Sequence, residues 1–128
     1  AHHPTEIKAV INSARQVYKD KKIICVFQPH RYSRVKSLKK EFASSFKLSN
    51  EVLLCPVYAA GEKVDNNFSQ DYFSQLISKK SRTQVINVKN QNELKNFFKK
   101  NLFDDEMVIC MGAGSISNWI REIGIELQ

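Results

Sequence analysis

Two arginines, a histidine, a tyrosine and a serine follow directly on an apolar run in the stretch VFQPHRYSR, residues 26–34. Arg31 and Arg34 are three residues apart in a turn that enters a predicted helix, so their guanidinium groups can point to the same side. A guanidinium group binds carboxylate or phosphate through paired hydrogen bonds, and the start of a helix adds backbone donors for an anion. We therefore predict an anion site at these arginines. The alternative is a pair of surface arginines that meet carboxylates of the same chain.

Further polar candidates lie in the same stretch and in the sequence VYAAGE, residues 57–62. His30 and Tyr32 either orient the bound anion or simply pack against their neighbours. Tyr58 and Glu62 form a second candidate rim. Glu62 either recognises the amine of a ligand or is a solvated loop residue, and the sequence leaves both readings open.

Two weaker signals lie near the ends of the chain. His2 and His3 precede a predicted helix, but no Asp, Glu or His lies at ligand spacing from them, so we expect no metal site. They either form hydrogen bonds at a domain edge or are merely terminal residues. The sequence GAGS, which starts at Gly112 and includes Gly114, resembles a dinucleotide-binding turn, but it lacks the third glycine because residue 117 is Ser. We interpret it as a tight strand-to-helix turn whose backbone amides face the ligand.

The pattern of apolar residues predicts alternating helices and strands. Apolar positions recur every three or four residues in the helical segments, and we expect Val10, Val17 and Tyr72 to face inward with the others. Apolar strands joined by helical crossovers predict a single Rossmann-like α/β domain with an open, mainly parallel sheet and helices on both faces. The expected helices span residues 4–18, 35–46, 69–78, 90–100 and 115–123, and the expected strands span residues 22–27, 52–57, 84–88 and 106–111.

The polar candidates fall at one edge of this predicted sheet. Ligands bind such sheets beyond the carboxyl ends of the strands, and the segments VFQPHRYSR, VYAAGE and MGAGSI all follow strands there. No catalytic group stands out, because the sequence has neither a phosphate-binding P-loop nor a serine in a nucleophile elbow. The pattern therefore predicts a binding edge without catalytic residues of its own.

The size and composition of the chain are those of one globular domain. It has 128 residues, of which 42% are hydrophobic and 26% charged, and no apolar run is long enough to cross a membrane. The net charge is +7, but the lysines are scattered over predicted helix ends and outer faces, so we expect no nucleic-acid partner. Cys25, Cys55 and Cys110 lie in apolar runs, which favours reduced core thiols in a cytoplasmic protein. Because the chain starts at Ala1 without a methionine, we expect it to come from a longer protein.

Four segments, HHPTE, VFQPHRYSR, VYAAGE and MGAGSI, in this order and at these distances, resemble the C-terminal domain of the Mur ligases. The resemblance covers nearly the whole chain, and HHPTE together with FQPHRYSR is highly specific. It is closest to the branch of the family that joins L-alanine to UDP-N-acetylmuramate in peptidoglycan synthesis. It implies that residues 1–128 form the Rossmann-like, amino-acid-binding domain, and that the domains for the UDP-sugar and for ATP are absent from this chain.

The chemistry of that family implies roles for the candidate residues. In these ligases ATP, with Mg²⁺, converts the muramoyl carboxylate into an acyl phosphate, which the amine of L-alanine attacks. The resemblance implies that Arg31 and Arg34 hold the carboxylate of L-alanine. The residues expected to support this clamp are His2, His30, Tyr32, Tyr58 and Glu62. The residues expected to face the nucleotide when the domain closes are His3, Gly112 and Gly114.

We expect this chain by itself to fold but not to ligate, and to bind neither ATP nor Mg²⁺ tightly. Two alternatives remain open. One is the same domain of a related ligase, which adds a recycled tripeptide to the same sugar. The other is a stand-alone Rossmann-type module for a nucleotide or a phosphorylated metabolite.

Overall fold

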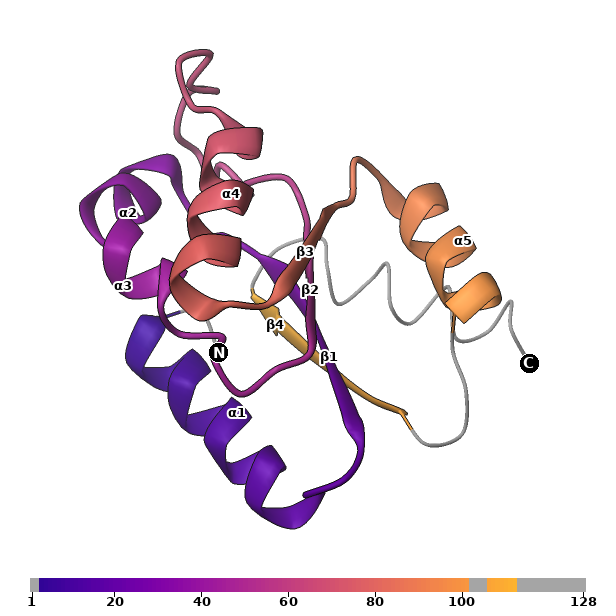
Figure 1. Ribbon diagram of the computed structural model, residues 1–128. Coiled ribbons are helices and arrows are strands. Elements are labelled where there is room, and N and C mark those ends of the chain that lie inside the picture. Colours follow the sequence, from indigo (N-terminus) through magenta and orange to yellow (C-terminus); the bar gives the residue numbers. More distant parts are fainter. Residues whose placement is uncertain (1–2, 102–105, 113–128) are drawn as a thin grey trace.

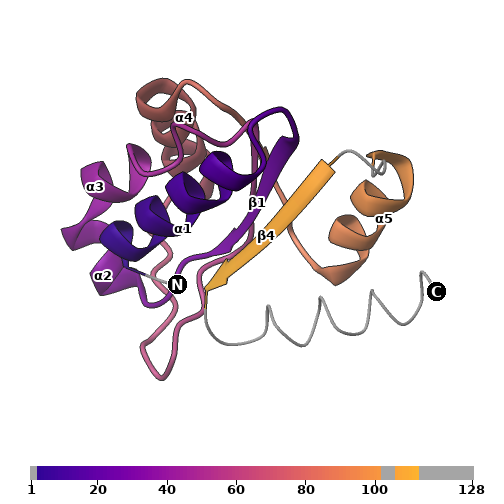
Figure 2. The same ribbon diagram turned by 90° about the horizontal axis from the view of Figure 1, so that it is seen from below.

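The structure of the chain is a computed structural model, which describes residues 3–101 and 106–112. The helices and strands of these residues are α1 (Pro4–Val17), β1 (Lys22–Gln28), α2 (Tyr32–Ser37), α3 (Lys39–Ala43), β2 (Glu51–Leu54), α4 (Gln70–Ser81), β3 (Gln84–Asn87), α5 (Gln91–Asn101) and β4 (Glu106–Gly112). The four strands form one parallel sheet in the order β3-β2-β1-β4. Helices α1 to α4 cover one face and α5 covers the other (Figures 1 and 2). The predicted α/β fold with a parallel sheet is confirmed.

Strand β1 lies at the centre of the sheet, and both of its faces are buried. Ile23, Cys25 and Phe27 belong to the apolar cluster on the side of α1 to α4. Ile24 and Val26 belong to the second cluster, on the side of α5. A strand that is buried on both faces has a continuous apolar sequence, which is why residues 22–27 could be recognised as a central strand.

Local capping groups set where α1 begins. The N–H group of Thr5 donates to Nδ1 of His3 at 3.3 Å, and the N–H group of His3 donates to Oε1 of Glu6 at 3.2 Å. Together they form a capping box, and Pro4 occupies the first helical position, where its missing N–H costs nothing. The predicted helix from residue 4 is therefore confirmed, and His3 has a structural task at its start.

Three of the residues that were expected to face inward do not. Val17 is 72% exposed, Tyr72 is 56% exposed and Val10 is 38% exposed. Each lies at the border of the apolar face of its helix, between positions that are buried in the core and positions that face solvent. Tyr72 instead lies on the surface, with the Lys39 ammonium group 5.2 Å from the centre of its ring.

The predicted helix 35–46 is wrong in its start and in its continuity. The structure has two short helices, α2 from Tyr32 and α3 from Lys39, separated by Leu38 with φ −116° and ψ 25°. The chain turns helical earlier than the sequence suggested, because the group that caps the first turn of α2 comes from a distant loop. After the break at Leu38, α3 contributes the fully buried Phe42 to the core.

The other elements agree with the predicted ranges to within a few residues. Strand β2 ends earlier than predicted, before Pro56, and α4 continues to Ser81. Ser69 caps α4, since its hydroxyl oxygen accepts the N–H of Tyr72 at 3.0 Å. Cys25 and Cys55 are buried, whereas Cys110, expected in the core, is exposed. The predicted helix 115–123 lies outside the described residues.

Candidate functional site

The chain segments that leave β1 and β2 pair with each other beyond the ends of these strands. The Arg31 N–H group donates to the carbonyl of Tyr58 at 2.8 Å, and the Tyr58 N–H group donates to the carbonyl of Pro29, also at 2.8 Å. The rings of His30 and Tyr58 stack with their centres 5.9 Å apart and an angle of 25° between their planes. The structure thus brings together the two segments that the sequence placed at one edge of the sheet.

This pairing holds Arg31 in an unusual backbone conformation. Its φ is 65° and its ψ is 129°, a region that side-chain-bearing residues adopt at a cost of about 1–3 kcal/mol. The hydrogen bond from its N–H group to Tyr58 fixes that conformation. The Arg31 side chain is exposed, and within the described residues neither it nor Arg34 forms an ion pair.

Arg34 lies on the first turn of α2, three residues after Arg31, and its side chain is half-buried. Arg31 lies before the helix in its own backbone conformation, so helical spacing does not set the direction of its side chain. Both residues lie in the turn beside the His30–Tyr58 stack, and that their guanidinium groups point to the same side stays a prediction.

Glu62 caps the turn that carries these arginines. Its Oε2 accepts the hydroxyl of Ser33 at 2.5 Å, and its Oε1 accepts the N–H group of Ser33 at 3.3 Å. The Ser33 hydroxyl lowers the pKa of Glu62 most, and the N–H groups of Ser33 and Tyr32 and the charge of Arg31 lower it further. Glu62 is therefore not simply a solvated loop residue.

The capping role of Glu62 changes one prediction from the sequence. The backbone donors at the start of the helix were expected to bind an external anion. In the structure the N–H group of Ser33 donates to the Glu62 carboxylate instead. The side chains of Arg31 and Arg34 remain as cationic groups for a ligand at this edge.

The loop that follows β2 lies against α2 beside these arginines. The ring of Tyr32 meets Phe68 edge-on, with the ring centres 5.6 Å apart. Lys36 of α2 forms an ion pair with Asp65 of the loop, and the hydrogen bond from Lys36 is the main reason that the pKa of Asp65 lies below its ordinary value. A hollow of about 660 Å³ separates α2 from loop residues 62–67. Tyr32 thus packs, which was one of the two options for it.

Gly112 ends β4 directly beside the end of β1, with which it is paired at Gln28. Its φ is +136°, and a Cβ atom there would lie 2.5 Å from the carbonyl oxygen of Gln28. The Gln28 side chain is buried and donates to the carbonyl of Pro56 at 3.3 Å, which ties the exits of β1 and β2 together. On one side of β1 the connection to β2 runs through α2 and α3 on one face of the sheet, and on its other side α5 leads into β4 on the opposite face. Ligands bind at such points, where the connections change from one face to the other.

The remaining predicted site residues are not brought to this edge by any described contact. His3 is engaged in the cap of α1, while His2 and Gly114 lie outside the described residues. Within residues 3–101 and 106–112, no three His, Cys, Asp or Glu side chains are grouped so that they could hold a metal ion. None of the helices in these ranges is long and apolar enough to cross a membrane.

The fold and this edge define a class of protein: a Rossmann-like α/β domain with a pair of arginines beyond the carboxyl end of its central strand. The family model of the Mur ligase, glutamate ligase domain, matches residues 1–114. The chain belongs to this family, and the resemblance seen in the four sequence segments is confirmed.

The relatives that the chain matches are considerably longer than the chain. It is 48% identical over 123 residues to the UDP-N-acetylmuramate–L-alanine ligase of Pelagibacter ubique, a match that covers 96% of the chain and 26% of that relative. It is 40% identical to the same-named ligase of a Sulfurihydrogenibium species, with 91% of the chain and 26% of the relative covered. The crystal structure of the UDP-N-acetylmuramate–alanine ligase of Thermotoga maritima superposes with a TM-score of 0.73 and 25% identity, over 100% of the chain and 25% of that structure. The chain thus spans about a quarter of the length of these proteins.

Proposed function

We propose that this chain is the C-terminal, amino-acid-positioning domain of the cytoplasmic, ATP-dependent ligase that joins L-alanine to UDP-N-acetylmuramate in peptidoglycan synthesis. The names of the relatives support this reaction, and the 48% identity extends over 96% of the chain. Because the chain spans about a quarter of those relatives, the UDP-sugar and ATP belong to other domains of the longer enzyme.

The observation that carries the proposal is the way the backbone of Arg31 is held. Its N–H group is bonded to the carbonyl of Tyr58, so its position relative to the sheet is fixed while its guanidinium group remains available. Arg34 lies three residues further along, in the first turn of α2. In the proposed enzyme these two groups bind the carboxylate of L-alanine and leave its amine free to react.

The reaction needs the amine to be held close to an activated carbonyl. The amine nitrogen attacks the acyl carbon of the muramoyl phosphate, an N–C bond forms, and the bond from that carbon to the phosphate oxygen breaks. Phosphate leaves with the electron pair, and the proton that the nitrogen loses passes to water. The residues of this chain bind and orient the amino acid, and such positioning alone contributes several orders of magnitude in rate. They supply no catalytic group.

ATP and Mg²⁺ do not fit the residues of this chain as a site of its own. The sequence has no P-loop, and the described residues offer no cluster of metal ligands. His3 uses Nδ1 in the cap of α1, which leaves Nε2 outside that cap. A contact between the nucleotide and His3, Gly112 or Gly114 upon domain closure is part of the proposal, and no chemical step depends on it.

Steady-state kinetics of the full-length enzyme test the proposal. We expect Arg31→Lys and Arg34→Lys to raise the KM for L-alanine about tenfold to a hundredfold, because each hydrogen bond to a charged group contributes about 1.5–3 kcal/mol and Lys cannot donate as a fork. The KM values for ATP and the UDP-sugar should stay unchanged. Lys40→Gln, which removes an exposed cation from α3, is the matched control.

Three results would contradict the proposal, each in a different way. An unchanged KM for L-alanine in both arginine variants would show that these arginines do not bind its carboxylate. A preference of the full-length enzyme for a tripeptide over L-alanine assigns the chain to the recycling ligase instead. Tight nucleotide binding by the 128-residue chain alone favours a stand-alone nucleotide-binding module.

A further inference from the structure

A second cationic hollow lies on the edge of the sheet opposite to Arg31 and Arg34. It has a volume of about 570 Å³ and lies between the end of α3 with its following segment and the end of α4. The residues that line it are Ser44, Lys47, Lys79, Lys80, Ser81 and Arg82. Directly after these residues, Thr83 leads into β3, and its hydroxyl donates to the carbonyl of Ser49 before β2. The hollow therefore lies at the amino ends of the strands.

The two segments that form this hollow are joined by a buried serine. The hydroxyl of Ser81 donates to the carbonyl of Ala43 at 2.5 Å and accepts the N–H group of Phe46 at 3.1 Å. Ser81 is 2% exposed and Phe46 is fully buried. The backbone segments that carry the cationic side chains are thus held together, with Lys47 on one segment and Lys79 and Lys80 on the other.

Four cations share this hollow, and within the described residues none of them forms an ion pair. Cations in the last turn of a helix are common because they favour the helix dipole, and this accounts for Lys79 and Lys80 in α4. It does not account for Lys47, which follows α3, or for Arg82. Arg82 occupies the left-handed position at the end of α4, with φ 52°, where Gly is usual.

The mutual repulsion of four positive charges is relieved when an anion enters between them. We propose that this hollow is a second anion-binding site, and that its ligand is a compact phosphate-type anion with at least two negative charges, such as a pyrophosphoryl group. A nucleic-acid strand fits less well, because such surfaces combine an extended basic groove with exposed aromatic side chains, and no aromatic side chain lines this hollow. The hollow and its charges are observed independently of the proposed function, and only the ADP and the L-alanine measurement in the test below rest on it.

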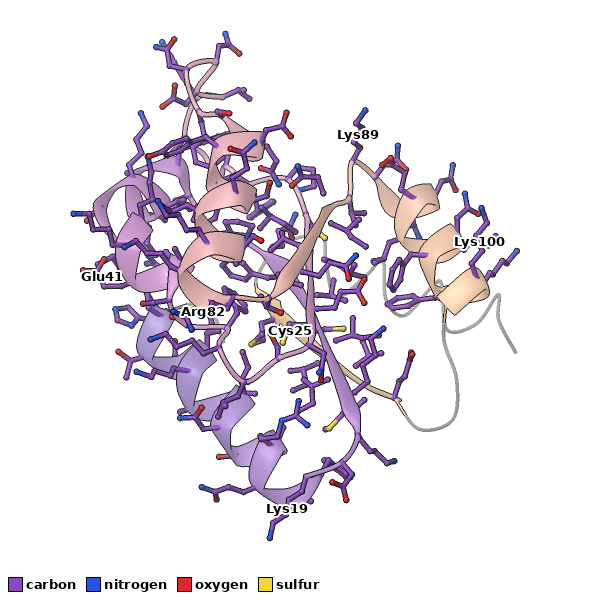
Figure 3. The ribbon with its side chains drawn as sticks, viewed as in Figure 1. Lys19, Cys25, Glu41, Arg82, Lys89 and Lys100 are labelled. Carbon is purple, nitrogen blue, oxygen red and sulfur yellow. The ribbon has the colours of Figure 1, made fainter. Side chains whose placement is uncertain are left out.

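The chain contains a matched control for this site. Lys99 and Lys100 occupy the last turn of α5, as Lys79 and Lys80 do in α4. Lys100 lies on the far side of the sheet from Arg82 (Figure 3). Exchange of either lysine pair for glutamine changes the net charge and the helix-end electrostatics equally. Only one of the two changes removes charge from the hollow.

Calorimetric titration of the full-length protein with pyrophosphate tests the site. Saturating ADP occupies the nucleotide site of the proposed enzyme, and the ionic strength is held constant. We expect K79Q/K80Q and, separately, R82Q to raise the dissociation constant for pyrophosphate at least tenfold. K99Q/K100Q should leave it unchanged, and thermal melts of all variants check that they fold. The KM for L-alanine should be the same in every variant, so that the two sites are tested separately.

Several outcomes would overturn the inference. Absence of pyrophosphate binding in the unaltered protein would show that the hollow is not an anion-binding site. An equal loss of affinity for pyrophosphate in K79Q/K80Q and K99Q/K100Q would show that only the net charge of the protein matters. If a single-stranded oligonucleotide binds more tightly than pyrophosphate at the same salt concentration, and R82Q weakens that binding, the ligand class is wrong and the surface binds nucleic acid.

Discussion

The hydroxyl group of Ser33 donates to Glu62 at 2.5 Å, and this bond joins the first turn of α2 to the loop that follows β2. Arg31 lies directly before that turn and Arg34 lies on it. We therefore expect a shift of Glu62 to move the backbone from which both arginine side chains extend. The bond connects loop position to ligand geometry, although Glu62 need not touch the ligand.

Loss of this bond should weaken the binding of L-alanine by the full-length enzyme. We expect Ser33→Ala and Glu62→Gln each to raise the KM for L-alanine about tenfold, since a misplacement of about 1 Å can cost up to a hundredfold. The double variant should be no worse than the single ones, because both remove the same interaction. Asp65→Asn is the control, as it removes a carboxylate of the same loop that pairs with Lys36. Additive losses in the double variant would show that the two residues act independently.

The same bond predicts a pH dependence of stability. The pKa of Glu62 is lowered by its bond to Ser33, so the folded state binds this proton more weakly than the unfolded state does. The stabilisation is present above the ordinary value of 4.5 and is lost as the pH falls through the lower pKa of the folded state. Denaturant unfolding of the 128-residue chain should show that Ser33→Ala is less stable than the unaltered chain at pH 6. The two curves should converge at lower pH, and a constant gap would contradict this.

Gly112 and Gly61 provide a matched pair of substitutions. Both have positive φ, 136° and 91°, but only Gly112 is crowded, since a Cβ there would lie 2.5 Å from the Gln28 carbonyl, whereas nothing lies within 4 Å at Gly61. We expect Gly61→Ala to lower the free energy of unfolding by about 1 kcal/mol through backbone strain, and Gly112→Ala by about 2–4 kcal/mol, because Gln28 must also move. Thermal melts measure both, and equal losses would show that the close approach is unimportant.

The sequence predicted those parts of the fold that depend on local patterns. The central strand was visible as a continuous apolar run, and the helix that begins after Ser69 was visible because its cap is local, with donor and acceptor three residues apart. The segments around Arg31 and Tyr58 could be placed at one edge of the sheet for a different reason. The carboxyl ends of all strands lie at the same edge as soon as the strands are known to be parallel.

What the sequence missed depends on contacts between distant residues. The start of α2 could not be found because its capping group, Glu62, lies 29 residues away from Ser33. Arg15 carried no signal either. Its guanidinium group donates to the carbonyls of Lys21 at 2.7 Å and Leu48 at 2.9 Å, which ties the end of α1 to the segments that enter β1 and β2. An arginine that satisfies backbone carbonyls cannot be told from a surface arginine by its position in the chain.

The buried thiols predict a loss of stability at alkaline pH. Burial raises the pKa of Cys25 and Cys55 to about 12, from an ordinary value of 9.0. In the folded chain both thiols stay protonated in the range where they ionise in the unfolded chain. Their contribution to stability is therefore complete below pH 9 and falls as the pH rises from 9 towards 12, by about 1.4 kcal/mol per pH unit for each thiol. Denaturant unfolding between pH 7 and about pH 11 measures this slope.

A Cys25→Ala/Cys55→Ala variant separates the thiols from every other group that titrates in this range. It should be less stable than the unaltered chain at pH 7, because it loses packing around two fully buried side chains. Its stability should then fall less steeply above pH 9, since tyrosine and lysine titrate equally in both proteins. The two curves should therefore approach each other as the pH rises. Parallel curves over the whole range would show that the two sites do not hold their protons more tightly in the folded state.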